Sequence, residues 1–127
     1  MNENYTDVDK MNQVYDASVS SGYHPSRGNL TGTEAVALHE LGHALTDHVG
    51  QKMGATSLDD AARRIFNNAY KATKGRGKYK DWAGKISGYA QQDYAETVAE
   101  AVADYYCNGA NAHPNSIAIM NELRKYA

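Results

Sequence analysis

The stretch VALHELGHALTDH, residues 36–48, constrains the fold of this chain more than any other feature. It contains His39, Glu40 and His43, the H-E-x-x-H arrangement. Four residues of an α-helix advance by about 400°, so both histidines project from one face and can bind the same metal ion. Glu40 lies beside that face, where its carboxylate can act on a water bound to the ion. The motif therefore predicts a metal-binding helix, and another element must bring a third ligand to it.

The residues around the motif predict where this helix begins and ends. Thr31 and Glu34 have the spacing of a capping box, in which each side chain accepts the backbone amide of the other residue. We expect a helix over residues 32–49, ended by Gly50. The motif then falls in the middle of the helix, where the backbone is most rigid.

Two of the candidates for the third ligand fit poorly. His48 follows His43 by five residues, which turns it about 140° away on the same helix. It also misses the spacing of the metzincins, so we expect an exposed or capping histidine. Cys107 is a soft ligand, but a lone cysteine near a helix end is more typical of packing. As the single cysteine, it excludes an internal disulfide.

The third candidate is a helix that we expect over residues 93–107, ended by Asn108-Gly109. Glu96, Glu100 and Asp104 recur every four residues and form one carboxylate stripe on it. The intervening residues are mostly alanine and valine, which favours close packing on a partner. Two carboxylates one turn apart suit a metal ligand and a hydrogen-bond partner for a ligating histidine. A solvated acidic face is the alternative interpretation.

HELGHAL, followed by Y-A-Q-Q-D-Y-A-E-T-V-A-E-A, resembles the catalytic domain of the anthrax lethal factor type of zinc peptidase. The family pattern is H-E-x-G-H and then Y-x6-E-x2-A-E-A, and the resemblance covers roughly residues 33–106. It implies that Glu96 is the third zinc ligand and that Glu100 orients a ligating histidine, His39. It also implies that the Tyr89 hydroxyl steadies the oxyanion, a role that suits a tyrosine beside a metal.

The resemblance implies a mainly α, small zincin-like metallopeptidase fold. That fold has an active-site helix, a Glu-bearing helix and at most a small edge β-ribbon. Its cofactor is Zn²⁺, held by His39, His43 and Glu96. The implied reaction is hydrolysis of peptide bonds in a protein or peptide substrate by a zinc-bound water that Glu40 activates.

The segments outside the two motifs predict further helices and at most a small ribbon of strand. Helical spacing of apolar residues occurs over 7–18, after a cap at 57–60, and over 116–126. Residues 19–25 look extended, so a substrate could be laid against an edge strand there, with Tyr23 and His24 as candidates for lining the cleft. A turn-adjacent surface position is the alternative for His24. Residues 72–85 read as a basic, mobile loop, either solvated or an anchor for an acidic partner.

Composition limits the class of protein. The 127 residues, 42% of them hydrophobic, fit a single domain over 1–127, and the polar abrupt start suggests a piece of a longer protein. Thirteen basic and fifteen acidic residues give a net charge of −2, which predicts no nucleic-acid and no membrane partner. We find no signal peptide and no apolar run of transmembrane length.

Two other functions are compatible with the same residues. The segment Gly22-Tyr23-His24-Pro25 resembles sequences in phage-derived proteins, which favours a bacterial or phage-like source. One alternative is therefore a non-catalytic metal-binding zincin module that acts in phage-like assembly or docking. The other is a selective toxin-type protease, which shares the chemistry and differs in its biological setting.

Overall fold

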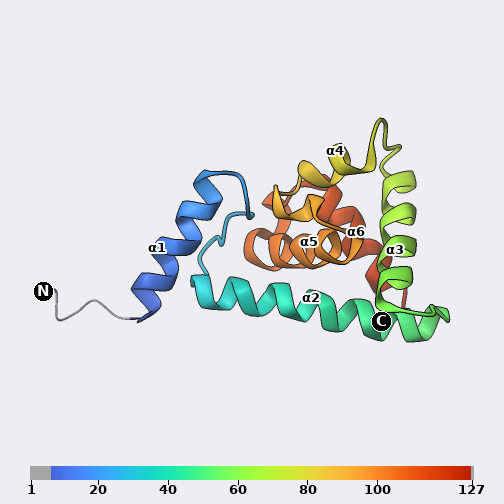
Figure 1. Ribbon diagram of the computed structural model, residues 1–127, viewed down its shortest axis with the longest axis horizontal. Coiled ribbons are helices and arrows are strands. Elements are labelled where there is room, and N and C mark those ends of the chain that lie inside the picture. Colours follow the sequence, from blue (N-terminus) through green and yellow to red (C-terminus); the bar gives the residue numbers. More distant parts are fainter. Residues whose placement is uncertain (1–6, 127) are drawn as a thin grey trace, which may run out of the picture.

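The computed structural model describes residues 7–126, which form six α-helices and two short 3₁₀ turns (Figure 1). The prediction of a mainly α fold is confirmed. The helices are α1 (Asp7–Ser20), α2 (Gly32–Met53), α3 (Leu58–Ala72), α4 (Tyr79–Gly84), α5 (Tyr94–Asn108) and α6 (Pro114–Arg124). The 3₁₀ turns are η1 (Tyr89–Gln91) and η2 (Gly109–Asn111).

The long helix α2 runs along one edge of the molecule, and α5 packs against its middle (Figure 1). α1 lies at the N-terminal end of α2, and α3 rises from its C-terminal end. α5 also contacts α3 and α6, and these three helices enclose an apolar core around Phe66, Val98 and Ile119. Because α5 is buried on nearly all sides, its acidic stripe faces other helices rather than solvent. The alternative of a solvated acidic face is therefore wrong.

The N-terminal end of α2 forms the predicted capping box, but its C-terminal end lies beyond the predicted one. The Thr31 hydroxyl accepts the Glu34 amide at 3.0 Å, and the Glu34 carboxylate accepts the Thr31 amide at 2.9 Å. The helix continues past Gly50 to Met53 and is capped by Gly54, whose φ of 73° is left-handed. Gly50 does not end the helix. It lies instead where α2 packs closely against α3, since a Cβ there would lie 2.7 Å from the Cβ of Ala61.

Replacing Thr31 by alanine should lower the free energy of unfolding by about 1 kcal/mol, because it removes the side-chain half of the capping box. Urea denaturation followed by circular dichroism measures the change. Thr33→Ala is the matched control, since Thr33 is exposed in the first turn of the helix and makes no cap. Equal losses from both substitutions would show that the box does not stabilise α2.

The closest contact between α2 and α5 is at a glycine. A Cβ on Gly42 would lie 2.6 Å from the Cα and 3.1 Å from the carbonyl oxygen of Ala99. The backbones of the two helices therefore touch at this point, which only a glycine in α2 permits. Gly42 precedes His43, and Ala99 lies between Glu96 and Glu100. The contact brings the two motifs of the sequence together.

The sequence allowed at most a small edge ribbon near residues 19–25, and the structure has none there; the expectation of an extended segment over 19–25 is wrong. α1 continues through Ser20, turns follow at 21–24, and no strand occurs within residues 7–126. The carbonyls of Gly22 and Tyr23 accept the amides of Gly88 and Tyr89 at 2.8 and 3.0 Å. Those carbonyls are thus already bonded to the segment before α5, so the backbone offers no edge there for strand addition to a substrate.

The prediction of a mobile basic loop over 72–85 is also wrong, because part of that segment is helical and packed. Trp82 in α4 is buried in the core against Phe66, and its indole Nε1–H donates to the Thr73 hydroxyl at 2.9 Å. The Tyr70 hydroxyl donates to the Gly77 carbonyl at 2.8 Å. An apolar anchor in the middle of the lysines therefore orders the segment.

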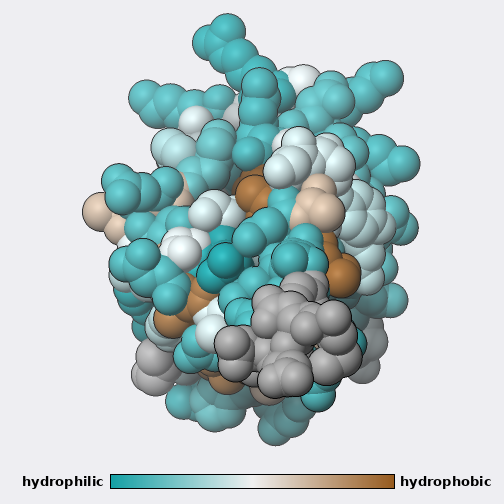
Figure 2. Space-filling view, turned by 90° about the vertical axis from the view of Figure 1, so that its left-hand side faces the viewer, coloured by the Kyte–Doolittle hydropathy of each residue, from teal (hydrophilic) through white to brown (hydrophobic). Residues whose placement is uncertain are grey.

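α1 is more exposed than its helical spacing predicts. Tyr15 is its buried residue, whereas Val8, Met11 and Val14 are exposed, the last by 67%. Figure 2 shows this end of the molecule, where hydrophobic side chains lie separately among hydrophilic ones. Within the part of the chain that the structure describes, no helix combines the length and the apolar character needed to cross a membrane.

Candidate metal centre

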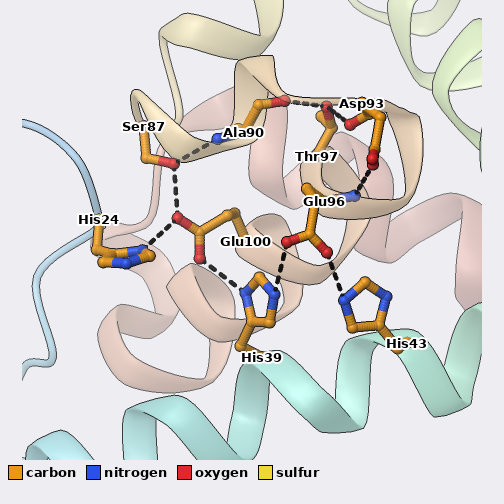
Figure 3. A network of polar contacts seen from close by, with 9 residues as sticks. All are labelled: His24, His39, His43, Ser87, Ala90, Asp93, Glu96, Thr97 and Glu100. Carbon is orange, nitrogen blue, oxygen red and sulfur yellow. Dashed lines mark hydrogen bonds and ion pairs between the residues drawn. The ribbon is translucent and has the colours of Figure 1, made fainter.

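Three side chains from two helices converge beside the Gly42 contact (Figure 3). His39 and His43 come from α2 and Glu96 from the first turn of α5, and one ligand atom of each lies within 4.8 Å of the others. The Nε2 atom of His39 is 3.3 Å from Glu96 Oε2, and that of His43 is 2.6 Å from Glu96 Oε1. The structure thus brings together the three residues that the sequence predicts as ligands.

The spacing of these atoms fits a small divalent cation. In a tetrahedral zinc site with bonds of about 2.1 Å, ligand atoms lie about 3.4 Å apart. The His39–Glu96 pair already has that separation. The His43–Glu96 pair, which involves the other carboxylate oxygen, is closer at 2.6 Å and would have to open by about 0.8 Å to admit the ion. Two imidazoles and one carboxylate are also a donor set that suits zinc.

Glu96 is positioned by the hydrogen bonds that begin α5. Asp93 caps the helix, and its carboxylate accepts the Glu96 amide at 2.8 Å. The Thr97 hydroxyl lies within hydrogen-bond distance of the carbonyls of Ala90 in η1 and of Asp93 (Figure 3). The direction of the Glu96 side chain is therefore set by a helix start that is fixed to η1.

Glu100 lies one turn further along α5 and is almost completely buried, with 1% of its surface exposed. Its Oε2 is 2.9 Å from Nδ1 of His39, while its Oε1 is 2.7 Å from Nδ1 of His24 and 2.8 Å from the Ser87 hydroxyl. Burial raises the pKa of Glu100, but the hydrogen bonds from His24, His39 and Ser87 outweigh it and hold the pKa below its usual value. Glu100 is thus an ionised acceptor with several donors.

The two histidines of this group have different hydrogen-bond partners. Burial lowers the pKa of His39, but the hydrogen bond and charge of Glu100, together with nearby carboxylates, outweigh it, and the net pKa is raised. A proton on Nδ1 of His39, donated to Glu100, leaves Nε2 free for a metal ion. Nδ1 of His43 is buried and has no hydrogen-bond partner among residues 7–126.

Glu40, Tyr89 and His39 line a cavity of about 290 Å³. The cavity is lined by Tyr15, His24, Ala35, Val36, His39, Glu40, Tyr89 and Glu100. A hydrogen bond with Glu96, assisted by burial, raises the pKa of Tyr89 to about 12. The Tyr89 hydroxyl therefore keeps its proton at neutral pH and can donate it in a hydrogen bond.

The remaining sequence candidates are not part of the group formed by His39, His43 and Glu96. His24 lines the cavity, but its ring nitrogen contacts Glu100 rather than facing a strand edge. Tyr23 is exposed and packs its ring on those of His24 and Tyr89, outside the cavity lining. His48 is exposed, as predicted. Burial raises the pKa of Cys107 to about 11, and Cys107 is not part of the metal-ligand group.

Sequence reasoning missed two residues at this site. Tyr15 on α1 stacks on His24, and Ser87 donates to Glu100, yet neither belongs to a recognisable motif. Asp104 completes the carboxylate stripe but accepts Asn108 Nδ2 and the His113 amide, at 2.9 and 3.0 Å. It fastens the end of α5 to the start of α6 and does not reach the metal site.

Comparison with family models, with curated proteins and with solved structures found no match to this chain. What can be concluded about the site therefore depends on its own geometry: two helices in backbone contact, carrying a group of His39, His43 and Glu96 that can hold a metal ion.

Proposed function

We propose that this protein is a zinc-dependent metallopeptidase with a zincin-like active site. The observation that carries the proposal is the convergence of His39, His43 and Glu96 next to a cavity lined by Glu40 and Tyr89. A site that only binds metal needs the three ligands. The additional presence of an exposed carboxylate and a protonated tyrosine hydroxyl at the same cavity favours hydrolysis.

The two residues divide the proton chemistry between them. When zinc is bound, it would polarise a carbonyl group and make a water molecule acidic enough to lose a proton near neutral pH. The Glu40 carboxylate would accept that proton and return it to the amine that leaves. The Tyr89 hydroxyl would donate to the oxygen of the scissile carbonyl as negative charge develops there. Glu100 accepts from Nδ1 of His39, which would leave Nε2 to hold the ion.

Metal removal tests the proposal directly. We would determine the metal content of the purified protein by mass spectrometry and offer a diverse peptide library before and after treatment with a chelator. The expected result is about one zinc ion per chain, with cleavage that stops on chelation and returns when zinc is added.

Other outcomes separate the alternatives. Cleavage that resists the chelator would contradict a metallopeptidase, and a chain that takes up no metal when zinc is added would contradict the metal centre itself. One zinc per chain without cleavage of any library peptide would favour the non-catalytic binding module.

A further inference from the structure

We propose that His24 is a positioning residue of the metal centre, which acts on the zinc ligand His39 through the shared carboxylate of Glu100. The inference rests on the proposed metal centre, but it does not require that the protein hydrolyses peptides. His24 belongs to the segment between α1 and α2, which lies outside both motifs of the sequence. The metal site therefore extends to a third part of the chain.

Two hydrogen bonds to Oε1 fix the position of the Glu100 carboxylate. Oε1 of this buried carboxylate is 2.7 Å from His24 and 2.8 Å from the Ser87 hydroxyl, which leaves Oε2 directed at His39 (Figure 3). Two donors on one oxygen fix the rotation of the carboxylate, and that rotation decides where the other oxygen points. Without His24, only one donor, Ser87, remains on Oε1, and the acceptor of the His39 proton becomes less well oriented.

Neighbouring aromatic rings and the backbone on either side fix the position of the His24 side chain. Its ring stacks on Tyr15 at 5.6 Å with an interplanar angle of 14°, and the Tyr89 ring lies 5.3 Å away, tilted by 52°. The residue before it, Tyr23, is fixed by the hydrogen bond from the Tyr89 amide, and the residue after it, Pro25, is buried. A histidine that is clamped in this way presents a fixed donor, as a rigid support for a metal ligand requires.

The Glu100 carboxylate supports only one of the two histidines proposed as ligands. Glu100 contacts His39, whereas Nδ1 of His43 has no partner in the described part of the chain. A change at His24 should therefore alter the metal site through His39 alone. Partners of ligating residues contribute about 10–100-fold to metal affinity, and we expect His24, one step further away, to contribute about tenfold.

The test compares the zinc affinity of His24→Ala and His24→Asn with the wild type, by competition with a chromophoric chelator. Asparagine places its Nδ2–H₂ near the position of the imidazole Nδ1 and can still donate to Glu100. We expect affinity to fall about tenfold in His24→Ala and to be largely restored in His24→Asn. His48→Ala, a change of the exposed histidine of α2, is the matched control and should bind zinc like the wild type.

A double-mutant cycle with Glu100→Gln separates positioning from a general effect on folding. If His24 acts through Glu100, then His24→Ala causes no further loss of zinc affinity in the Glu100→Gln background. An equal loss in both backgrounds would overturn the proposal, as would wild-type affinity in His24→Ala when Glu100→Gln binds weakly. Should His24→Ala fail to fold, the same cycle with His24→Phe, which keeps an aromatic ring but cannot donate to Glu100, gives the answer. A wild type that binds no zinc would instead contradict the metal centre on which the inference rests.

Discussion

Replacing Glu40 by glutamine should lower the rate of peptide hydrolysis by about 10²–10⁴-fold while the chain keeps one bound zinc ion. Glutamine has the shape of glutamate but cannot accept a proton, so the loss falls on proton transfer. Glu40 does not belong to the group of His39, His43 and Glu96, so the metal content should not change. The measurement is turnover of a cleaved library peptide, with metal content determined on the same samples.

Asp47→Asn is the matched control for this substitution. Asp47 is an exposed acid on the same helix, and its replacement removes the same charge from α2 without touching the cavity. Its turnover should equal that of the wild type. If Glu40→Gln cleaves as fast as the control, Glu40 is not the base, and the proposed division of proton chemistry is wrong.

Replacing Gly42 by alanine should destabilise the fold by about 1–3 kcal/mol and weaken zinc binding. At most helix-interior positions the same change is favourable by about 1 kcal/mol, because alanine is the better helix former. Here the new Cβ would lie 2.6 Å from the Cα of Ala99, and a backbone atom cannot rotate away. α5 must therefore shift away from α2, which separates Glu96 from the two histidines. Urea denaturation in the presence of a chelator gives the free energy of unfolding, and chelator competition gives the zinc affinity.

Gly50→Ala distinguishes a local effect on the site from a loss of packing. Gly50 is also a tight contact within α2, but it meets α3 and lies about 10 Å along the helix from His43. Gly50→Ala should lower stability without changing the zinc affinity of the folded protein.

Ala99→Gly should not rescue Gly42→Ala, because the clash is with the Cα rather than the side chain of Ala99. Unchanged zinc affinity in Gly42→Ala would show that the site tolerates a wider separation of the helices.

The ligands on α2 could be predicted from sequence because their relation is local. His39 and His43 share a face of any α-helix, and the capping box around Thr31 fixes where that helix begins. The carboxylates on α5 could be predicted as a stripe, again from helical spacing. Their assignment to metal ligand and supporting acid required the family resemblance, since spacing alone also allowed a solvated face.

The errors came from residues whose role depends on a distant partner. Gly50 has the sequence signature of a helix end, yet glycine serves equally where two helices touch, and only the packing of α3 decides between these uses. Residues 72–85 look mobile because of their lysines and glycines, but Trp82 inserts into a core made by other helices. The contact of His24 with Glu100 spans 76 positions and follows no periodic pattern.

The backbone contact between Gly42 and Ala99 has a consequence for which cation the site prefers. It brings the backbones of α2 and α5 into contact, and Glu96 lies only 3.3 and 2.6 Å from the two histidines. Zinc bonds nitrogen at about 2.0–2.1 Å with four ligands, whereas calcium takes six to eight oxygen ligands at about 2.3–2.6 Å. Calcium would need wider spacing and more oxygen atoms than this part of the chain supplies. If the site binds zinc as proposed, we therefore expect the glycine contact, which supplies no ligand itself, to help to exclude the larger calcium ion.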